Sequence, residues 1–134
     1  MGTKKKSWLL IAMLALTAAP SMAQYRVDRL ITAGRSALFY EDYVLSIKYF
    51  NLAIGAKPYL YEPWYFRSVA KFSLDDYTGA ESDATEALQL NPYVNDIYDL
   101  RAICRIRQNN YEDAIKDYNR AIHLEPRNRN YWFN

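Results

Sequence analysis

Cysteine and histidine are almost missing from this chain of 134 residues, which contains one of each. A single cysteine, Cys104, excludes a disulfide within the chain. One cysteine and one histidine also cannot supply the four ligands of a structural zinc site. None of the four glycines stands in a Gly-x-Gly-x-x-Gly or Gly-x-x-x-x-Gly-Lys pattern, which excludes the phosphate-binding loops that these motifs predict. The sequence therefore predicts no metal site and no nucleotide-phosphate site.

The usual constellations of catalytic side chains are missing as well. The only histidine, His123, has arginine, asparagine and glutamate as its polar neighbours, and we expect it to face solvent. Adjacent carboxylates occur three times, each time at an expected turn, where capping of the following helix explains them better than acid–base chemistry across a cleft. These pairs are Glu41-Asp42, Asp75-Asp76 and Glu112-Asp113. We therefore expect a protein that is not an enzyme and that needs no cofactor.

Long apolar runs are also missing, apart from one of 12 residues between Trp8 and Ala19. That run is too short to cross a membrane, and it follows three lysines at positions 4–6. Small residues at Ser21 and Ala23 then precede Gln24 at the spacing of a signal-peptidase cut. Residues 1–23 are thus predicted to be a bacterial secretory signal peptide, with an uncleaved membrane anchor as the alternative. The mature chain is expected in the periplasm or outside the cell.

Removal of the predicted signal peptide changes the charge of the chain. The whole chain has 17 basic and 15 acidic residues, and three of the basic ones are the lysines of the signal peptide. The remaining residues 24–134 carry 14 basic and 15 acidic side chains. A net charge of −1 gives no support for nucleic-acid binding or for binding to an anionic membrane. We expect no insertion of the mature chain into a membrane.

The strongest positive feature is a repeat of 34 residues. Proline recurs at 58, 92 and 126, tyrosine at 43, 77 and 111, and alanine at 53, 87 and 121. Each period contains two segments whose apolar residues step by three and four, which predicts stacked helical hairpins. The first helices are expected at about Val27–Tyr40, Tyr61–Leu74 and Asp96–Gln108. The second helices are expected at about Tyr43–Ala56, Tyr77–Leu90 and Tyr111–Leu124.

Small and charged residues recur with the same step. Small residues at positions 34, 68 and 102, and at 46, 80 and 114, are expected to let the two helices of a hairpin approach closely. Arg67 and Arg101 recur with Asp83 and Asp117, and either each pair joins across its own hairpin or both residues are solvated. Cys104 stands 34 residues after an alanine, so we expect a buried small side chain, with a reactive thiol as the alternative.

These positions carry a resemblance to the tetratricopeptide repeat family. Its order of Trp or Tyr, Gly or Ala, Tyr, Ala, aromatic, Ala and Pro is matched in the second repeat by Trp64, Ser68, Tyr77, Ala80, Ala84, Ala87 and Pro92. The third repeat matches with Tyr98, Ala102, Tyr111, Ala114, Tyr118, Ala121 and Pro126, and the first, more divergent, with Leu30, Gly34, Tyr43, Ser46, Phe50, Ala53 and Pro58. The resemblance implies an all-α, right-handed α-solenoid over residues 24–134. Its repeats are expected at about 27–60, 61–94 and 95–128, with an incomplete fourth first helix at 129–134.

The resemblance also implies a binding site, because the concave groove of the family is lined by its first helices. The implied groove residues are Ile31, Arg35, Phe39, Tyr65, Val69, Ser73, Asp99, Ile103 and Arg107, with Glu62 and Asp96 at the groove edge. About half of them are expected to pack against neighbouring hairpins instead. Members that bind chaperones grip a peptide carboxylate with Lys and Asn, but here those positions read Ile31, Arg35, Phe66, Asp96 and Leu100. We expect a scaffold that binds an extended or helical protein segment with apolar content.

Two further hypotheses stay open. The 13 tyrosines and three tryptophans could stack on sugar rings, although most of them occupy core positions of the repeat. The segment Asn130–Asn134, with Trp132 in the register of Trp64, resembles the first turn of another helix. The chain is then either the front of a longer array or a self-assembling protein whose uncapped last hairpin pairs with another subunit.

Overall fold

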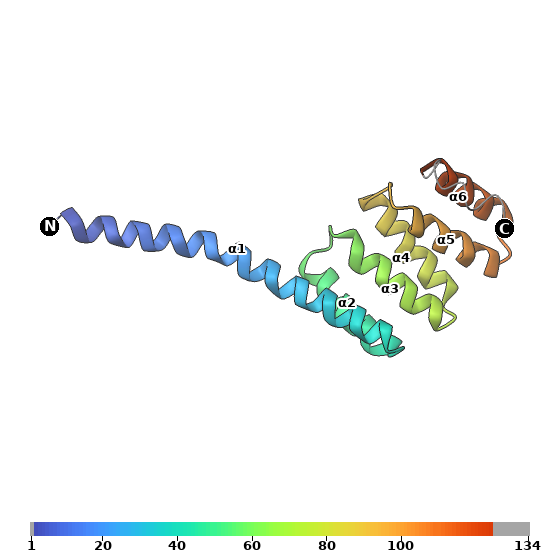
Figure 1. Cartoon of the computed structure of the whole chain (residues 1–134), viewed down its shortest axis with the longest axis horizontal. Helices are drawn as coiled ribbons and strands as arrows, with labels where there is room; N and C mark the ends of the chain where they lie inside the picture. The colour runs from blue at the N-terminus through green and yellow to red at the C-terminus, as the bar shows by residue number, and fades with distance from the viewer. Residues whose placement is uncertain (1, 125–134) are drawn as a thin grey trace.

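The computed structural model describes residues 2–124, which form six α-helices (Figure 1). The helices are α1 (Gly2–Phe39), α2 (Tyr43–Ala56), α3 (Tyr61–Ser73), α4 (Tyr77–Leu90), α5 (Asn95–Arg107) and α6 (Tyr111–Leu124). Each helix packs on the next, so that three hairpins, α1–α2, α3–α4 and α5–α6, stack in sequence order. The described part of the chain contains no strand, and the fold is an all-α solenoid of helical hairpins.

The predicted helix bounds are met closely in all but one place. The three second helices begin and end at the predicted residues, and α3 and α5 lie within one residue of theirs. The exception is α1, which was expected to begin at Val27 and instead begins at Gly2. No glycine or proline stands between positions 21 and 27, so nothing in this stretch interrupts a helix. The first part of α1 projects away from the hairpins (Figure 1).

The turns within the hairpins share one construction. Their first residue, Glu41, Asp75 or Asn109, has a positive φ of 61–62°, which reverses the chain in two residues. In the first two turns the next residue caps the following helix, because an Oδ1 of Asp42 or Asp76 accepts a backbone N–H at 3.0–3.1 Å. The predicted capping role therefore belongs to the second member of each acidic pair.

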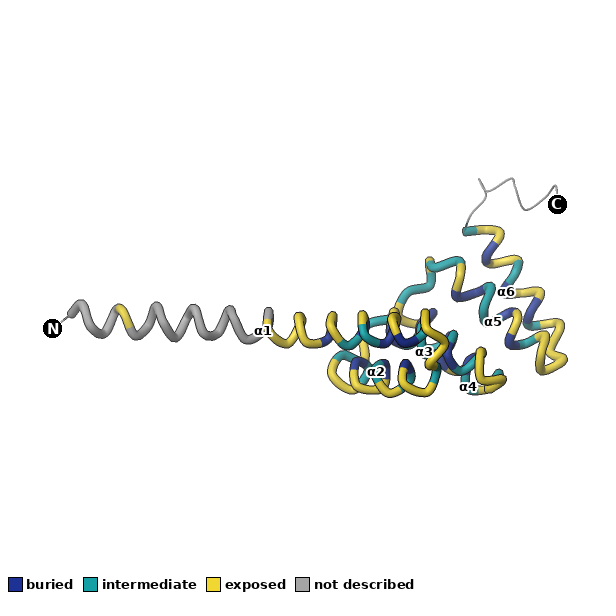
Figure 2. Tube along the Cα trace, turned by 60° about the horizontal axis from the view of Figure 1, so that its bottom comes forward, coloured by how far each residue is buried: buried dark blue, intermediate teal, exposed yellow. Residues whose placement is uncertain are grey.

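Small residues set the distance between the helices of a hairpin, as predicted. A Cβ added at Gly34 would lie 2.5 Å from the Phe50 ring, so only glycine fits opposite that ring. In the second hairpin the same position is Ser68, whose buried hydroxyl donates to the carbonyl of Ala80 at 2.6 Å. Figure 2 shows buried residues along the faces where helices meet and exposed residues at the turns.

Both predicted arginine–aspartate pairs form across their hairpins. Arg67 contacts both carboxylate oxygens of Asp83 at 2.8 Å, and Arg101 contacts those of Asp117 at 3.0 and 2.7 Å. Each aspartate is only 3% exposed and has a second basic partner, Lys71 Nζ or Arg105 Nη1, at 3.0 or 2.8 Å respectively. The charges are therefore paired twice over where they are removed from water.

The same arginines also reach the preceding hairpin. Nη1 of Arg67 donates to Oδ1 of Asn51 in α2 at 2.8 Å, and Nη1 of Arg101 donates to Oγ1 of Thr85 in α4 at 3.2 Å. One guanidinium thus connects three helices in each of the last two repeats. In the first repeat the corresponding positions are Ala33 and Tyr49, so this hairpin has no such ion pair.

The single cysteine and the single histidine occupy the places expected of them. Cys104 is fully buried in α5, and burial raises the pKa of its thiol to about 11. His123 is exposed on α6. Among the described residues, no helix is both long enough and apolar enough to traverse a lipid bilayer.

The doubly paired aspartate leads to a stability prediction. Asp83→Ala leaves Arg67 and Lys71 without their buried partner, which is expected to lower the free energy of unfolding by about 3–5 kcal/mol. Urea unfolding followed by circular dichroism measures this change. The control is Lys116→Ala, whose ion pairs are exposed and whose unfolding midpoint should stay unchanged. Equal midpoints for the two variants would contradict the prediction.

The buried thiol leads to a second prediction. Because the folded pKa of Cys104 is about 11, its thiolate is rare at pH 8, and we expect iodoacetamide to label the folded chain far more slowly than the urea-unfolded chain. The folded-state labelling rate should still be rising between pH 9 and pH 10, where an unfolded cysteine approaches its maximum. Mass spectrometry of timed samples measures both rates. Equal rates at pH 8 would show that the thiol is accessible.

Candidate functional site

The helix contacts determine which side of the solenoid is concave. First helices contact one another, α1 with α3 and α3 with α5, whereas α2, α4 and α6 do not. Helices that lie closer together occupy the inner side of a bend, so α1, α3 and α5 form the concave side. The groove residues predicted from the sequence all lie on these three helices.

Tyr65 lies at the middle of this side, between two acidic residues of α5. Its side chain is half-buried, and its pKa is raised first by burial and then by the negative charges of Asp96 and Asp99. Asp99 also acts on Tyr118 of α6, whose pKa is raised by burial and by that carboxylate. The structure thus brings three predicted groove residues together and adds Tyr118, which the sequence assigned only to the core.

The α1 end of the groove differs from the prediction in part. Ile31 is 8% exposed and packs with Val27 and Ala53, so it belongs to the core of the first hairpin. The Arg35 guanidinium instead lies over the Phe66 ring of α3, 5.0 Å from its centroid, and is exposed to solvent. Phe39 is 80% exposed at the end of α1.

The remaining groove residues lie farther along α3 and α5. Val69 is half-buried, and Ile103 is exposed on the next helix. Ser73 is exposed and donates its hydroxyl to the Val69 carbonyl at 3.0 Å. Arg107 lies 5.8 Å from the centroid of the Tyr77 ring, which places its charge beside the turn of the preceding hairpin. The accessible apolar surface of the groove is therefore Tyr65, Val69 and Ile103.

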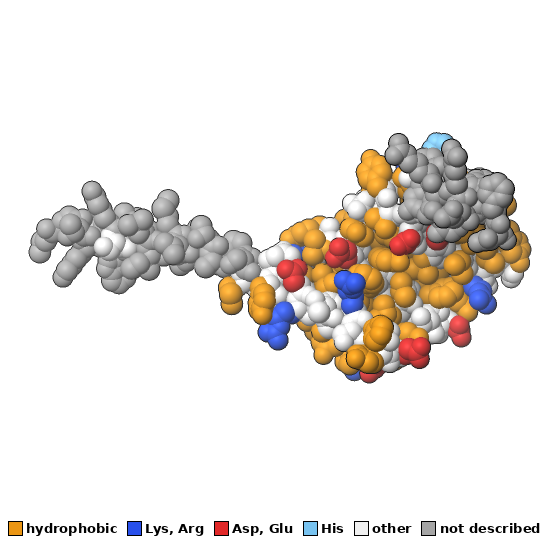
Figure 3. All heavy atoms as spheres, viewed as in Figure 1, with side chains coloured by type: hydrophobic (Ala, Val, Ile, Leu, Met, Phe, Trp, Pro, Cys, Tyr) orange, Lys and Arg blue, Asp and Glu red, His pale blue; other side chains and the backbone are white. Residues whose placement is uncertain are grey.

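An acidic residue opens the helical part of every repeat on this side. Glu62 and Asp96, the predicted edge residues, are exposed, and one step of 34 back from Glu62 stands Asp28, also exposed. Within residues 2–124 none of the three forms an ion pair with a basic side chain. Asp28 was absent from the predicted site, although the period alone would have found it. Figure 3 shows acidic side chains interspersed with apolar ones over the body of the solenoid.

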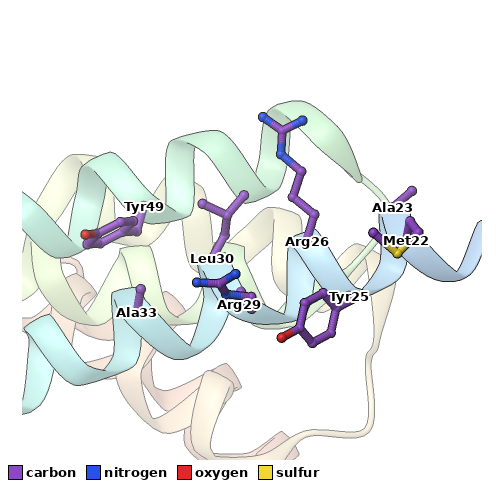
Figure 4. Close-up of a pocket in the computed structure, with 8 residues that line it drawn as sticks. All are labelled: Met22, Ala23, Tyr25, Arg26, Arg29, Leu30, Ala33 and Tyr49. Carbon is purple, nitrogen blue, oxygen red and sulfur yellow. The ribbon is translucent and has the colours of Figure 1, made fainter.

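A surface hollow of about 650 Å³ lies elsewhere, along α1 and α2 (Figure 4). It is lined by Met22, Ala23, Tyr25, Arg26, Arg29, Leu30, Ala33 and Tyr49. Ala33 and Tyr49 are the residues that replace the arginine–aspartate pair of the later repeats. Met22 and Ala23 precede the predicted cleavage point, so signal cleavage would remove part of this wall. The hollow contains no carboxylate, histidine or thiol for catalysis.

The described side chains offer no metal centre, since no three of their His, Cys, Asp or Glu residues come together as ligands. Trp64 and Tyr98, candidates for stacking on a ligand, are engaged in packing. The Trp64 indole donates to the carbonyl of Pro58 at 2.9 Å, and the Tyr98 hydroxyl donates to the carbonyl of Pro92 at 3.1 Å. The arrangement is therefore a surface for contact with another molecule.

Comparison with known proteins agrees with this geometry. The sequence profile of the tetratricopeptide repeat matches residues 96–128. No curated protein matches the chain. Among solved structures, the first TPR of Spaghetti (RPAP3) bound to an HSP90 peptide is 30% identical, with a TM-score of 0.74 over 76% of this chain and 81% of that one.

Two further structures are similar. The first TPR domain of human RPAP3 is 30% identical, with a TM-score of 0.72 over 76% of this chain and 80% of that one. The Arabidopsis OM64 TPR domain shares the fold at 21% identity, with a TM-score of 0.76 over 80% of this chain and 88% of that one. The repeat in register, the stacked hairpins and a relative 30% identical over most of its length place the chain in the tetratricopeptide repeat family.

Proposed function

We propose that the protein is a non-catalytic scaffold that binds a segment of a partner protein along the concave side of α1, α3 and α5. The observation that carries the proposal is the exposed strip in which Tyr65, Val69 and Ile103 lie beside Asp96 and Asp99. Apolar side chains of a partner segment would be buried against the strip. Repeat proteins of this architecture commonly use their concave surface in this way.

The charges of the groove favour a segment with basic side chains. Three exposed acidic residues recur along one edge, and Asp99 adds a fourth at the centre. The related RPAP3 domain is described as bound to the HSP90 peptide SRMEEVD, which ends in acidic residues. In this chain Asp96 stands where the resemblance places a basic or amide side chain, and Ile31 is buried. An acidic peptide end would therefore meet repulsion at Asp96.

We further propose that residues 24–134 act in the bacterial envelope after export. This part of the proposal rests on the lysines at positions 4–6, the apolar run and the small residues before Gln24. The net charge of −1 for residues 24–134 is compatible with a partner that carries the complementary basic segment.

The binding proposal is tested by affinity capture from envelope extract on immobilised residues 24–134. We expect one or two proteins to be retained, and their affinity to fall at least tenfold in Tyr65→Ala/Ile103→Asp, because a groove anchor is lost and a charge is added. Binding should also weaken as salt is raised from 0.05 to 0.5 M.

Leu52→Asp is the matched control, since it adds the same charge at an exposed leucine of α2, away from the concave side. Partners retained by the wild type and this control, but lost by the groove variant, support the proposal. Equal capture by all three proteins, or capture of no protein, contradicts it.

The export proposal has a separate test. When the 134-residue chain is produced in a bacterium, we expect a periplasmic protein whose first residue is Gln24, as read by N-terminal sequencing. Ala23→Arg should abolish this cleavage, because the peptidase site requires small residues. A cytoplasmic wild-type protein that begins at Met1 would refute export without affecting the groove.

A further inference from the structure

The outer face of α6 is apolar and exposed. Along the described part of this helix, Ile115 is 58% and Ile122 is 49% exposed, and Tyr111, one turn before Ile115, is 57% exposed. The opposite face of α6 is covered by α5, with Ala114 and Ala121 buried. An apolar helix face of this kind is a docking surface when something in the molecule specifies its occupant.

The chain uses the same face twice inside the solenoid. Leu88, one repeat before Ile122, is only 6% exposed because Ile97 and Tyr98 of α5 cover it. In α2 the face that receives α3 carries Ile47, Asn51 and Ile54, and α6 repeats these residue types at 115, 119 and 122. The α6 face therefore has the chemistry that receives the first turn of a following first helix.

Residues 129–134 lie outside the described residues, but the repeat register assigns them to that position. Tyr131 corresponds to Pro63 and Ile97, which are both buried. Trp132 corresponds to the aromatic residues at 64 and 98, each of which donates a hydrogen bond to a proline carbonyl six residues earlier. Pro126 stands six residues before Trp132.

A second copy of the chain fits this face less well. Its α1 would have to take the place of a following first helix, with Arg29 at the buried position of Ile97 and Ala33 at the position of Arg101. An arginine there would lose water without a partner carboxylate, because α6 offers isoleucine at this point. The aromatic pair of residues 131 and 132 has no such cost.

We propose that Tyr131 and Trp132 seat on the last turns of α6 and cover Ile122, with the Trp132 indole donating to the carbonyl of Pro126. In this register Phe133 follows Tyr65 and Asp99 along the concave side, and Asn130 follows Asp96. The seated segment thereby adds an aromatic side chain to the groove. The seating is independent of the proposed function, and only the role of Phe133 rests on it.

Two matched substitutions test the seating in the 134-residue chain. The first turn of a following helix reaches Ile122 but not Ile115, because the corresponding Glu81 is contacted by Arg105, well beyond that turn. We expect Ile122→Asp to increase amide exchange in the last turns of α6 about tenfold and to lower Tm, and Ile115→Asp to change neither. In a Tyr131→Ser/Trp132→Ser background the two substitutions should become equivalent. Equal effects of the two in the native chain overturn the proposal.

A fluorescence measurement covers the outcome in which Ile122→Asp fails to fold. In a Trp8→Phe/Trp64→Tyr chain Trp132 is the only tryptophan, and the tyrosine at 64 can make the bond that Tyr98 makes. We expect acrylamide to quench Trp132 several-fold more weakly than free indole, at every protein concentration. Quenching equal to free indole overturns the seating. Protection that appears only at high concentration assigns the face to a second copy and also overturns it.

Discussion

A buried aspartate held by two cations connects the helices of each of the last two repeats. Asp83 and Asp117 each accept both hydrogen bonds of an arginine fork, and the same arginine reaches back to the preceding hairpin. Burying such charges stabilises the fold only when every group is satisfied, and here each carboxylate has at least three donors. The contact is directional, so it also sets the angle at which one hairpin follows the next. The curvature that makes α1, α3 and α5 the concave side depends on this angle.

The first hairpin reaches the same geometry by different means. Without the arginine–aspartate pair, it relies on steric fit, because the Phe50 ring fills the space left by Gly34 and the ring also stacks against Phe66 of α3 at 5.9 Å. This aromatic contact continues to Arg35, which lies on the other side of the groove wall. Packing in the first repeat and ion pairing in the later ones therefore produce one continuous concave side.

Periodicity predicted what is repeated and failed where the chain departs from the period. The second helices follow from residues that recur at every step, and so do both ion pairs. The start of α1 does not, because helix formation continues through residues 21–27 for a local reason, the lack of a helix-breaking residue. In the groove, the register placed Tyr65 beside α5. It could not tell that Ile31 is buried, because burial depends on the neighbouring Val27 and Ala53 of a divergent repeat.

The electrostatics of the groove follow from the same mixture of period and departure. An acidic residue at the start of each repeat is periodic, so its charge accumulates along one edge of the concave side. Asp99 is not periodic, since the corresponding residues are Tyr65 and Ile31, and it brings negative charge to the centre of the groove beside Tyr65. A ligand that spans the groove must therefore satisfy charge at the edge and at the centre while it covers apolar surface between them. A basic, partly apolar segment meets both demands, and a free carboxylate meets neither.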